Sequence, residues 1–110
     1  EMAHLGGVGF RLDFSSIQWL PGAWTYAQQD MFPGGMGRNR EFFQPWVHFE
    51  GTFADHEQDL LFDPQTSGGL LMAAPPENAA ALLAALQTAG DDARIIGEVG
   101  GDRGYLVITR

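Results

Sequence analysis

The sequence contains no cysteine and no lysine, and these two absences exclude whole classes of chemistry. Without cysteine there is no disulfide, no thiolate nucleophile and no sulfur ligand for a metal. Without lysine there is no Schiff base and no lysine of the kind that a P-loop directs at phosphates. The chain therefore cannot be a self-contained P-loop kinase or a thiol enzyme.

Positive charge is also scarce, because arginine supplies all six basic residues against fourteen aspartates and glutamates. The resulting net charge of −8 repels the phosphate backbone of nucleic acids and the anionic surface of membranes. No apolar run approaches the roughly 20 residues that span a bilayer. We therefore expect a soluble, cytoplasmic protein with neither nucleic acid nor membrane as a partner.

The chain does contain enough apolar material for a core, since 45% of its 110 residues are hydrophobic, including three tryptophans and eight phenylalanines. This length suits one compact domain and is too short for two ordinary ones. The first residue is not methionine, and residues 1–5 resemble the last turn of a helix that Gly6 and Gly7 end. We expect residues 1–110 to form a single domain of a longer protein.

Apolar periodicity predicts a mixed α/β fold. Alternation over residues 8–14 predicts a half-buried strand, and the apolar run at 70–74 predicts a buried central strand. Alanine and leucine dominate residues 77–89, which predicts a helix with Pro76 in its first turn and Gly90 at its end. Four more helices are expected: from Ser15 or Ser16 to Leu20, over residues 23–31, from Glu41 with Asn39 as its N-cap, and over residues 55–62. Two more strands are expected over residues 93–99 and 104–109, joined by a connection of hairpin length.

The first candidate site is the glycine-rich stretch at residues 32–37, which we expect to be a loop that runs into a helix. A helix start offers free backbone N–H groups, and Arg38 and Arg40 stand beside it to pair with phosphate oxygens. The alternative is a glycine-rich turn whose arginines are solvated, which is the more common meaning of so short a motif.

The second candidate site is the loop at residues 63–69, which has the sequence Asp-Pro-Gln-Thr-Ser-Gly-Gly. It concentrates a carboxylate, an amide, two hydroxyls and two glycines beside an expected strand, and ligand-binding groups are often carried by such loops. The alternative is an Asp-Pro turn in which Thr66 and Ser67 bond the local backbone. Because the glycines lead into a strand and not a helix, a Walker-type phosphate cradle is excluded, although a backbone nest stays possible.

Other patterns favour structural roles. The three histidines, His4, His48 and His56, lack the close spacing of zinc ligands, so we expect no metal site. Residues 55–59 predict a solvated acidic helix face. Ser67 lacks the G-x-S-x-G context of a serine hydrolase.

The two candidate loops carry a resemblance to a known family. Pro33-Gly34-Gly35 with Arg38-Asn39, and then the string from Leu61 to Leu71 that contains Asp-Pro-Gln-Thr-Ser-Gly-Gly, closely resemble the C-terminal half of selenophosphate synthetases (selenide, water dikinases). The resemblance covers nearly the whole chain and is weakest over residues 44–54. It implies a three-layer α/β/α sandwich with a mixed sheet, shared with aminoimidazole ribonucleotide synthetase and thiamine-monophosphate kinase.

The resemblance also implies an activity, in which selenide, ATP and water give selenophosphate, AMP and phosphate with the help of Mg²⁺. The resemblance further implies a homodimer, in which an N-terminal domain binds ATP and Mg²⁺ and carries the catalytic cysteine or selenocysteine. We therefore expect no catalytic residue and no metal ligand in this chain. The residues that it places in a substrate or nucleotide cleft are Gly34, Gly35, Arg38, Asn39, Asp63, Gln65, Thr66, Ser67, Gly68 and Gly69.

Two alternatives stay open. The chain could belong to another ATP-dependent phosphoryl-transfer enzyme of the same superfamily, with an acceptor such as thiamine monophosphate. It could also act, as an isolated piece, as a non-catalytic interaction or dimerisation module, since it lacks the catalytic groups. In each case we expect the 110 residues alone to fold without turnover.

Overall fold

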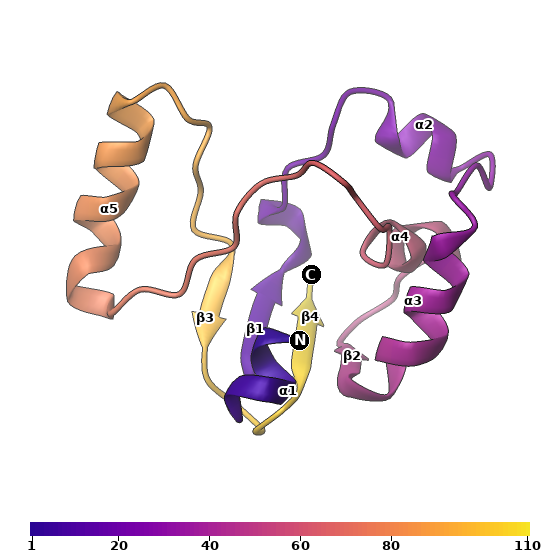
Figure 1. Ribbon diagram of the computed structural model, residues 1–110, viewed down its shortest axis with the longest axis horizontal. Helices are drawn as coiled ribbons and strands as arrows, with labels where there is room; N and C mark the ends of the chain where they lie inside the picture. Colours follow the sequence, from indigo (N-terminus) through magenta and orange to yellow (C-terminus); the bar gives the residue numbers. More distant parts are fainter.

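The structure, a computed structural model, describes residues 1–110 as a four-stranded mixed sheet with helices around it (Figure 1). Its elements in chain order are α1 (Met2–Gly6), β1 (Phe10–Asp13), the 3₁₀ turn η1 (Phe14–Ser16), α2 (Ala23–Ala27), α3 (Gly35–Phe43), the 3₁₀ turn η2 (Gln44–Trp46), β2 (Val47–Phe49), α4 (Asp55–Leu60), α5 (Pro76–Thr88), β3 (Gly97–Val99) and β4 (Leu106–Thr109). The mixed α/β class that the sequence predicts is confirmed. None of these helices is long and apolar enough to cross a membrane.

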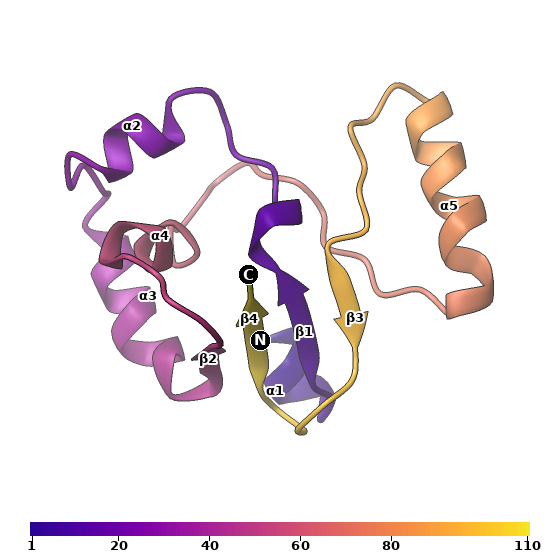
Figure 2. The same ribbon diagram turned by 180° about the vertical axis from the view of Figure 1, so that it is seen from behind.

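The strand order is β2-β4-β1-β3, with β1 parallel to β4 and antiparallel to β3. The expected hairpin of the last two strands is therefore wrong, because β1 lies between them. Their connection passes around the end of β1 (Figures 1 and 2), where the amide of Gly100 donates to the carbonyl of Gly9 at 2.9 Å and that of Gly104 donates to the carbonyl of Val8 at 3.1 Å. These bonds satisfy backbone groups that a tight hairpin turn would have paired locally.

Strand β1 forms where the alternation predicts it, with Phe10 and Leu12 buried and Arg11 exposed. Asp13 ends the strand, and its carboxylate accepts hydrogen bonds from the amide of Ser15 at 3.0 Å and the hydroxyl of Ser16 at 2.5 Å. These bonds hold the pKa of Asp13 below its ordinary value, chiefly through the Ser16 hydroxyl. The helix expected from Ser15 or Ser16 to Leu20 is wrong, because Asp13 caps a single 3₁₀ turn at residues 14–16.

The core gathers around three buried residues: Leu12 of β1, Ile108 of β4 and Phe14 of the turn η1. Aromatic rings surround Phe14, whose centroid lies 5.5 Å from that of Trp19, 5.9 Å from Trp24 and 5.3 Å from Phe53. Each such pair contributes about 0.5–1.5 kcal/mol beyond its buried area. This cluster joins segments from η1 to the start of α4.

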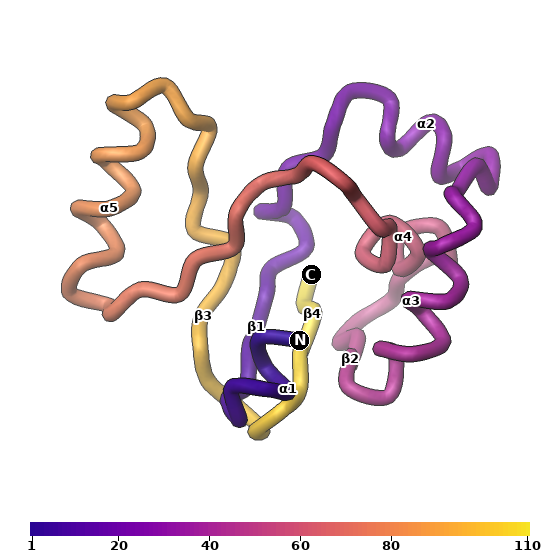
Figure 3. The backbone as a smooth tube through the Cα atoms, viewed as in Figure 1, coloured from indigo at the N-terminus to yellow at the C-terminus, as the bar shows by residue number.

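Helix α5 forms as predicted, with Pro76 as its first residue and a positive φ of 96° at Gly90 just after its end. It has no buried residue, so its formation depends on the high helix propensity of alanine and leucine more than on packing. The buried strand expected at 70–74 is wrong. That segment has no strand hydrogen bonds, and Leu70 is 87% exposed. Figure 3 shows the connection between α4 and α5, which contains this segment, crossing from the α4 side of the sheet to the β3 side.

The remaining elements follow the sequence closely. The helical turn at the start of the chain ends at Gly7, which has a φ of 62°. Helix α2 ends at Ala27, four residues before the predicted end of that helix. Helix α4 occupies most of the stretch predicted at 55–62. Strand β2 lies within residues 45–54, which the sequence left unassigned.

Gly97 tests the pairing of β1 with β3. A Cβ atom at this position would lie 2.1 Å from the carbonyl oxygen of Arg11 and 2.9 Å from the Cα of Leu12. We expect Gly97→Ala to lower the free energy of unfolding by about 1–3 kcal/mol, because the strands must separate to admit the methyl group. Gly100→Ala is the matched control, since it meets nothing within 4 Å. Equal urea midpoints for the two variants would contradict this pairing.

Candidate functional site

The predicted cleft residues fall into two segments, the first half of α3 and the loop after α4. Helix α3 begins at Gly35, more than one turn before the expected start at Glu41. It starts early because the amide of Met36 already donates to the carbonyl of Pro33 at 2.9 Å, which closes a turn. The expectation of an open glycine loop over 32–37 with Asn39 as the N-cap is therefore wrong. Asn39 lies in the middle of the helix.

The side chain of Asn39 has a different task from capping. Its Nδ2 donates to the backbone carbonyl of Phe62 at 3.0 Å, and Phe62 itself is 7% exposed. This carbonyl is the last one before the loop at residues 63–69. The hydrogen bond therefore ties helix α3 to the start of the second candidate segment.

A close backbone approach adds a second tie between the same segments. A Cβ atom at Gly35 would lie 2.7 Å from Cγ of Pro64, so only glycine fits against the proline ring without movement. Gly34 and Gly37, by contrast, have nothing within 4 Å of an added Cβ. Of the three glycines in this stretch, only Gly35 is required by packing.

Arg40 does not serve as a free anion-binding group, which corrects that part of the first candidate site. Its Nη1 pairs with Oδ1 of Asp59 at 2.5 Å, and its Nη2 lies 3.9 Å from Asp55. Asp59 is buried, so the expectation of a solvated acidic face on α4 is wrong at this residue. The signal was present in the sequence, because residues 55 and 59 are four apart and share one face of a helix.

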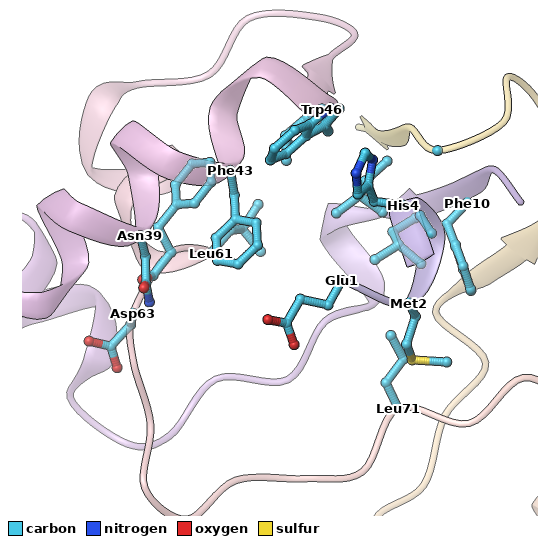
Figure 4. A pocket seen from close by; sticks show the side chains of 16 residues that line it. Glu1, Met2, His4, Phe10, Asn39, Phe43, Trp46, Leu61, Asp63 and Leu71 are labelled. Atoms are coloured by element: carbon cyan, nitrogen blue, oxygen red, sulfur yellow. The ribbon is translucent and has the colours of Figure 1, made fainter. Parts of the chain in front are cut away.

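The two ties place Asn39 and Asp63 together at one end of a cavity of about 480 Å³ (Figure 4). Its other walls come largely from apolar side chains of α1, α3, β1 and β4. The rings of His4 and Trp46 are 4.5 Å apart on the side away from Asp63. Asp63 and Glu1 line the cavity while no arginine does, so it is not suited to hold a polyphosphate by itself.

The rest of the loop faces solvent. Gln65, Thr66 and Ser67 are exposed, as are the glycines that follow them, Gly68 and Gly69. The loop makes no backbone hydrogen bond from Gln65 to Gly69, so the local turn that was the alternative interpretation is not formed. An amide and two hydroxyls are thus free to meet a ligand.

The structure does not unite all ten predicted residues. Asn39 and Asp63 share the cavity, and Gly35 contacts the loop, whereas Arg38 is exposed and lies outside the cavity lining. No group of three histidine, aspartate or glutamate side chains is placed to hold a metal ion. Pro64 and the carbonyl of Phe62 are contacts that sequence reasoning missed, because a close approach between distant segments leaves no local pattern.

Comparison with known proteins gives the chain a family. The family model described as "AIR synthase related protein, C-terminal domain" matches residues 1–109, and the mixed sheet with its helices is consistent with that fold. Three relatives are each named "Selenide, water dikinase". The relative from Carboxydothermus hydrogenoformans is 40% identical over 93% of this chain and 30% of its own length. The relative from Pelobacter propionicus is 41% identical over 90% of this chain and 29% of its own length. The relative from Bordetella bronchiseptica is 38% identical over 97% of this chain and 30% of its own length. The resemblance found in the sequence is confirmed, and the chain spans about 30% of these relatives.

The pairing of α3 with α4 can be tested through Arg40. Replacing Arg40 with glutamine leaves the carboxylate of Asp59, which is 11% exposed, without its cation. We expect a loss of about 1–3 kcal/mol in the free energy of unfolding, measured by urea titration. Arg94→Gln is the control, because Arg94 and Asp92 are both exposed and 3.7 Å apart, and it should cost under about 0.5 kcal/mol. Similar losses in both variants would contradict a structural role for the Arg40 pair.

Acid should weaken the cap of α4. The carboxylate of Glu57 accepts from the amide of Ala54 at 2.8 Å and from Arg110 at 2.5 Å, and the pKa of Glu57 lies below its ordinary value of 4.5, first because of the Ala54 amide. A lowered folded-state pKa means that this stabilisation is complete above pH 4.5 and is lost as the pH falls through the lower value. Unfolding titrations from pH 6 to 3 should therefore show a shallower decline for Glu57→Gln than for Glu77→Gln. Parallel curves would refute the assignment.

Proposed function

The chain belongs to the family of AIR synthase related C-terminal domains, and from this membership we propose that it is the C-terminal domain of a selenophosphate synthetase (selenide, water dikinase). The observation that carries the proposal is the loop at 63–69. This loop has the sequence Asp-Pro-Gln-Thr-Ser-Gly-Gly, and its Gln65, Thr66 and Ser67 are exposed and without hydrogen-bond partners. Identities near 40% to proteins named selenide, water dikinase support it.

The proposed reaction converts ATP, selenide and water to selenophosphate, AMP and orthophosphate. In a phosphoryl transfer, catalysis is mostly positioning and charge neutralisation. The cavity of this chain is lined by the carboxylates of Asp63 and Glu1 and by no lysine or arginine, so the cavity does not supply the neutralising charge. We propose that Mg²⁺ and ATP are held mainly by an N-terminal domain of the longer protein.

The contribution of this chain is then to orient substrate from one side of the site. The hydroxyls of Thr66 and Ser67 and the amide of Gln65 can donate hydrogen bonds to oxygen atoms without adding charge. Gly68 and Gly69 let the backbone come close to the substrate. Asp63 lies at the fixed start of the loop, beside Asn39, where it can accept a hydrogen bond.

The full protein is proposed to act in the cytoplasm as a homodimer, with selenide and ATP as its small-molecule substrates. The relatives are more than three times as long as this chain, which leaves room for the N-terminal domain. The 110 residues alone are proposed to bind no substrate productively and to be inactive.

The decisive experiment is selenide-dependent formation of AMP from ATP by the full-length protein, with the 110-residue chain assayed beside it. We expect turnover from the full-length protein only. Phosphate transfer that needs thiamine monophosphate or another acceptor in place of selenide would show that the protein is a different enzyme of the superfamily. A full-length protein with no phosphoryl transfer at all would contradict the proposed function.

Removal of a loop hydroxyl should weaken the reaction without weakening the fold. In the full-length protein, Thr66→Ala and Ser67→Ala should each lower selenide-dependent kcat/KM about 10-fold, since loss of one hydrogen bond to a reacting group costs about 1.4 kcal/mol. Thr25→Ala is the control, because Thr25 is exposed on α2 and makes no side-chain hydrogen bond. Unchanged kcat/KM in both loop variants would discard the loop as a substrate contact.

A further inference from the structure

Residues 65–69 of the loop are exposed and make no backbone hydrogen bonds. Hydrogen bonds within the loop therefore do not fix the positions of its side chains. Any precision that it has must come from its first residues. Both contacts that fix them reach across from α3: the hydrogen bond from Asn39 to the carbonyl of Phe62 and the packing of Gly35 on Pro64.

The spacing of these contacts makes them a matched pair. Residues 35 and 39 are one helical turn apart and share a face of α3, with a rise of about 6 Å between them. Their partners, residues 62 and 64, are two apart in an irregular segment, a span of up to about 6.6 Å when extended. The helix face and the loop start therefore fit each other at two points, which fixes the direction of the chain as well as its position.

The base of this arrangement is itself anchored. Arg40, the residue after Asn39, pairs with Asp59 on α4. This ion pair fixes α3, which contacts the loop, against α4, which precedes the loop in the chain. The side chain of Phe62 is buried beneath the junction. The loop is thus held at one end by α3 and α4 together, while residues 65–69 project into solvent.

We propose that Gly35 and Asn39 are positioning residues for the reaction, which fix the loop at 63–69 so that Gln65, Thr66 and Ser67 meet the substrate. In this role Gly35 and Asn39 act on the reaction through the loop and not through a bond to the substrate. This inference rests on the proposed function, and it changes the meaning of the first glycine-rich motif from an anion site to a support for the second motif. A displacement of about 1 Å in such groups can cost as much as 100-fold in rate.

Steric rescue tests the Gly35 contact in the full-length protein. Gly35→Ala places a methyl group 2.7 Å from Cγ of Pro64 and should lower selenide-dependent kcat about 10-fold or more, with KM for ATP within twofold. Pro64→Ala removes the atom that is struck, so adding Gly35→Ala to it should cost less than threefold. Gly37→Ala is the matched control in the same helix, because it faces open space, and it should keep its kcat within twofold of the wild type.

A second cycle tests Asn39. Asn39→Asp keeps the shape of the side chain but cannot donate to the carbonyl of Phe62, and it should lower kcat with little change in KM. Because both ties hold one loop, Gly35→Ala should cost clearly less in the Asn39→Asp background than in the wild type. Independent, multiplying effects, or a rise in KM for ATP without loss of kcat, would overturn the positioning role.

Failure of the proposed function is distinguishable from failure of this inference. If the wild-type protein forms no AMP in response to selenide, the proposed function is lost and the catalytic part of the inference falls with it. The contact itself is then judged from thermal unfolding of the same four variants, Gly35→Ala, Pro64→Ala, the double variant and Gly37→Ala. A lowered Tm for Gly35→Ala that Pro64→Ala restores supports the contact between Gly35 and Pro64, and a Tm equal to that of Gly37→Ala refutes it.

Discussion

Hydrogen bonding along both edges of β1 is the constraint on which the remaining elements depend. The strand pairs with β3 on one side and with β4 on the other, and its Leu12 packs with Ile108 at the centre of the core. Asp13 then turns the chain so that Phe14 points into the aromatic cluster. Without β1 between them, β3 would have no strand partner and β4 would keep only its parallel pairing with β2. The core would also lose Leu12, which packs beside Phe14 and Ile108.

The candidate site is connected to this core by a short series of contacts. Phe53, which packs against Phe14, precedes α4, and α4 holds α3 through the pair of Asp59 with Arg40. That pair matters more than the bidentate pair of Arg11 with Glu50, whose side chains are 44% and 56% exposed and therefore screened by water. The loop is thus placed by one partly buried ion pair, one hydrogen bond and one glycine.

Local patterns predicted local structure well, and tertiary relations escaped them. Alternation located β1, and the alanine-rich run located α5, because each signal lies within the element that it describes. The run at 70–74 is equally apolar, yet it pairs with no strand, and strand pairing is a tertiary relation that no local pattern reports. Asn39 has the chemistry of an N-cap, and only the position of Phe62 shows that its amide is used elsewhere.

The two candidate segments differ in how far their side chains are committed to partners within the chain. The helix supplies rigidity, since Asn39 and Arg40 are both committed to partners within the chain and Gly35 is in contact with proline. The loop leaves neutral hydrogen-bond donors exposed at Gln65, Thr66 and Ser67, and neutral donors do not offset the charge of an anion. Because the cavity between α1 and α3 is lined by carboxylates and by no arginine, it supplies none of the positive charge that a polyphosphate needs. The proposed function therefore assigns that charge to the N-terminal domain of the longer protein, and it assigns the orientation of substrate to the loop at 63–69.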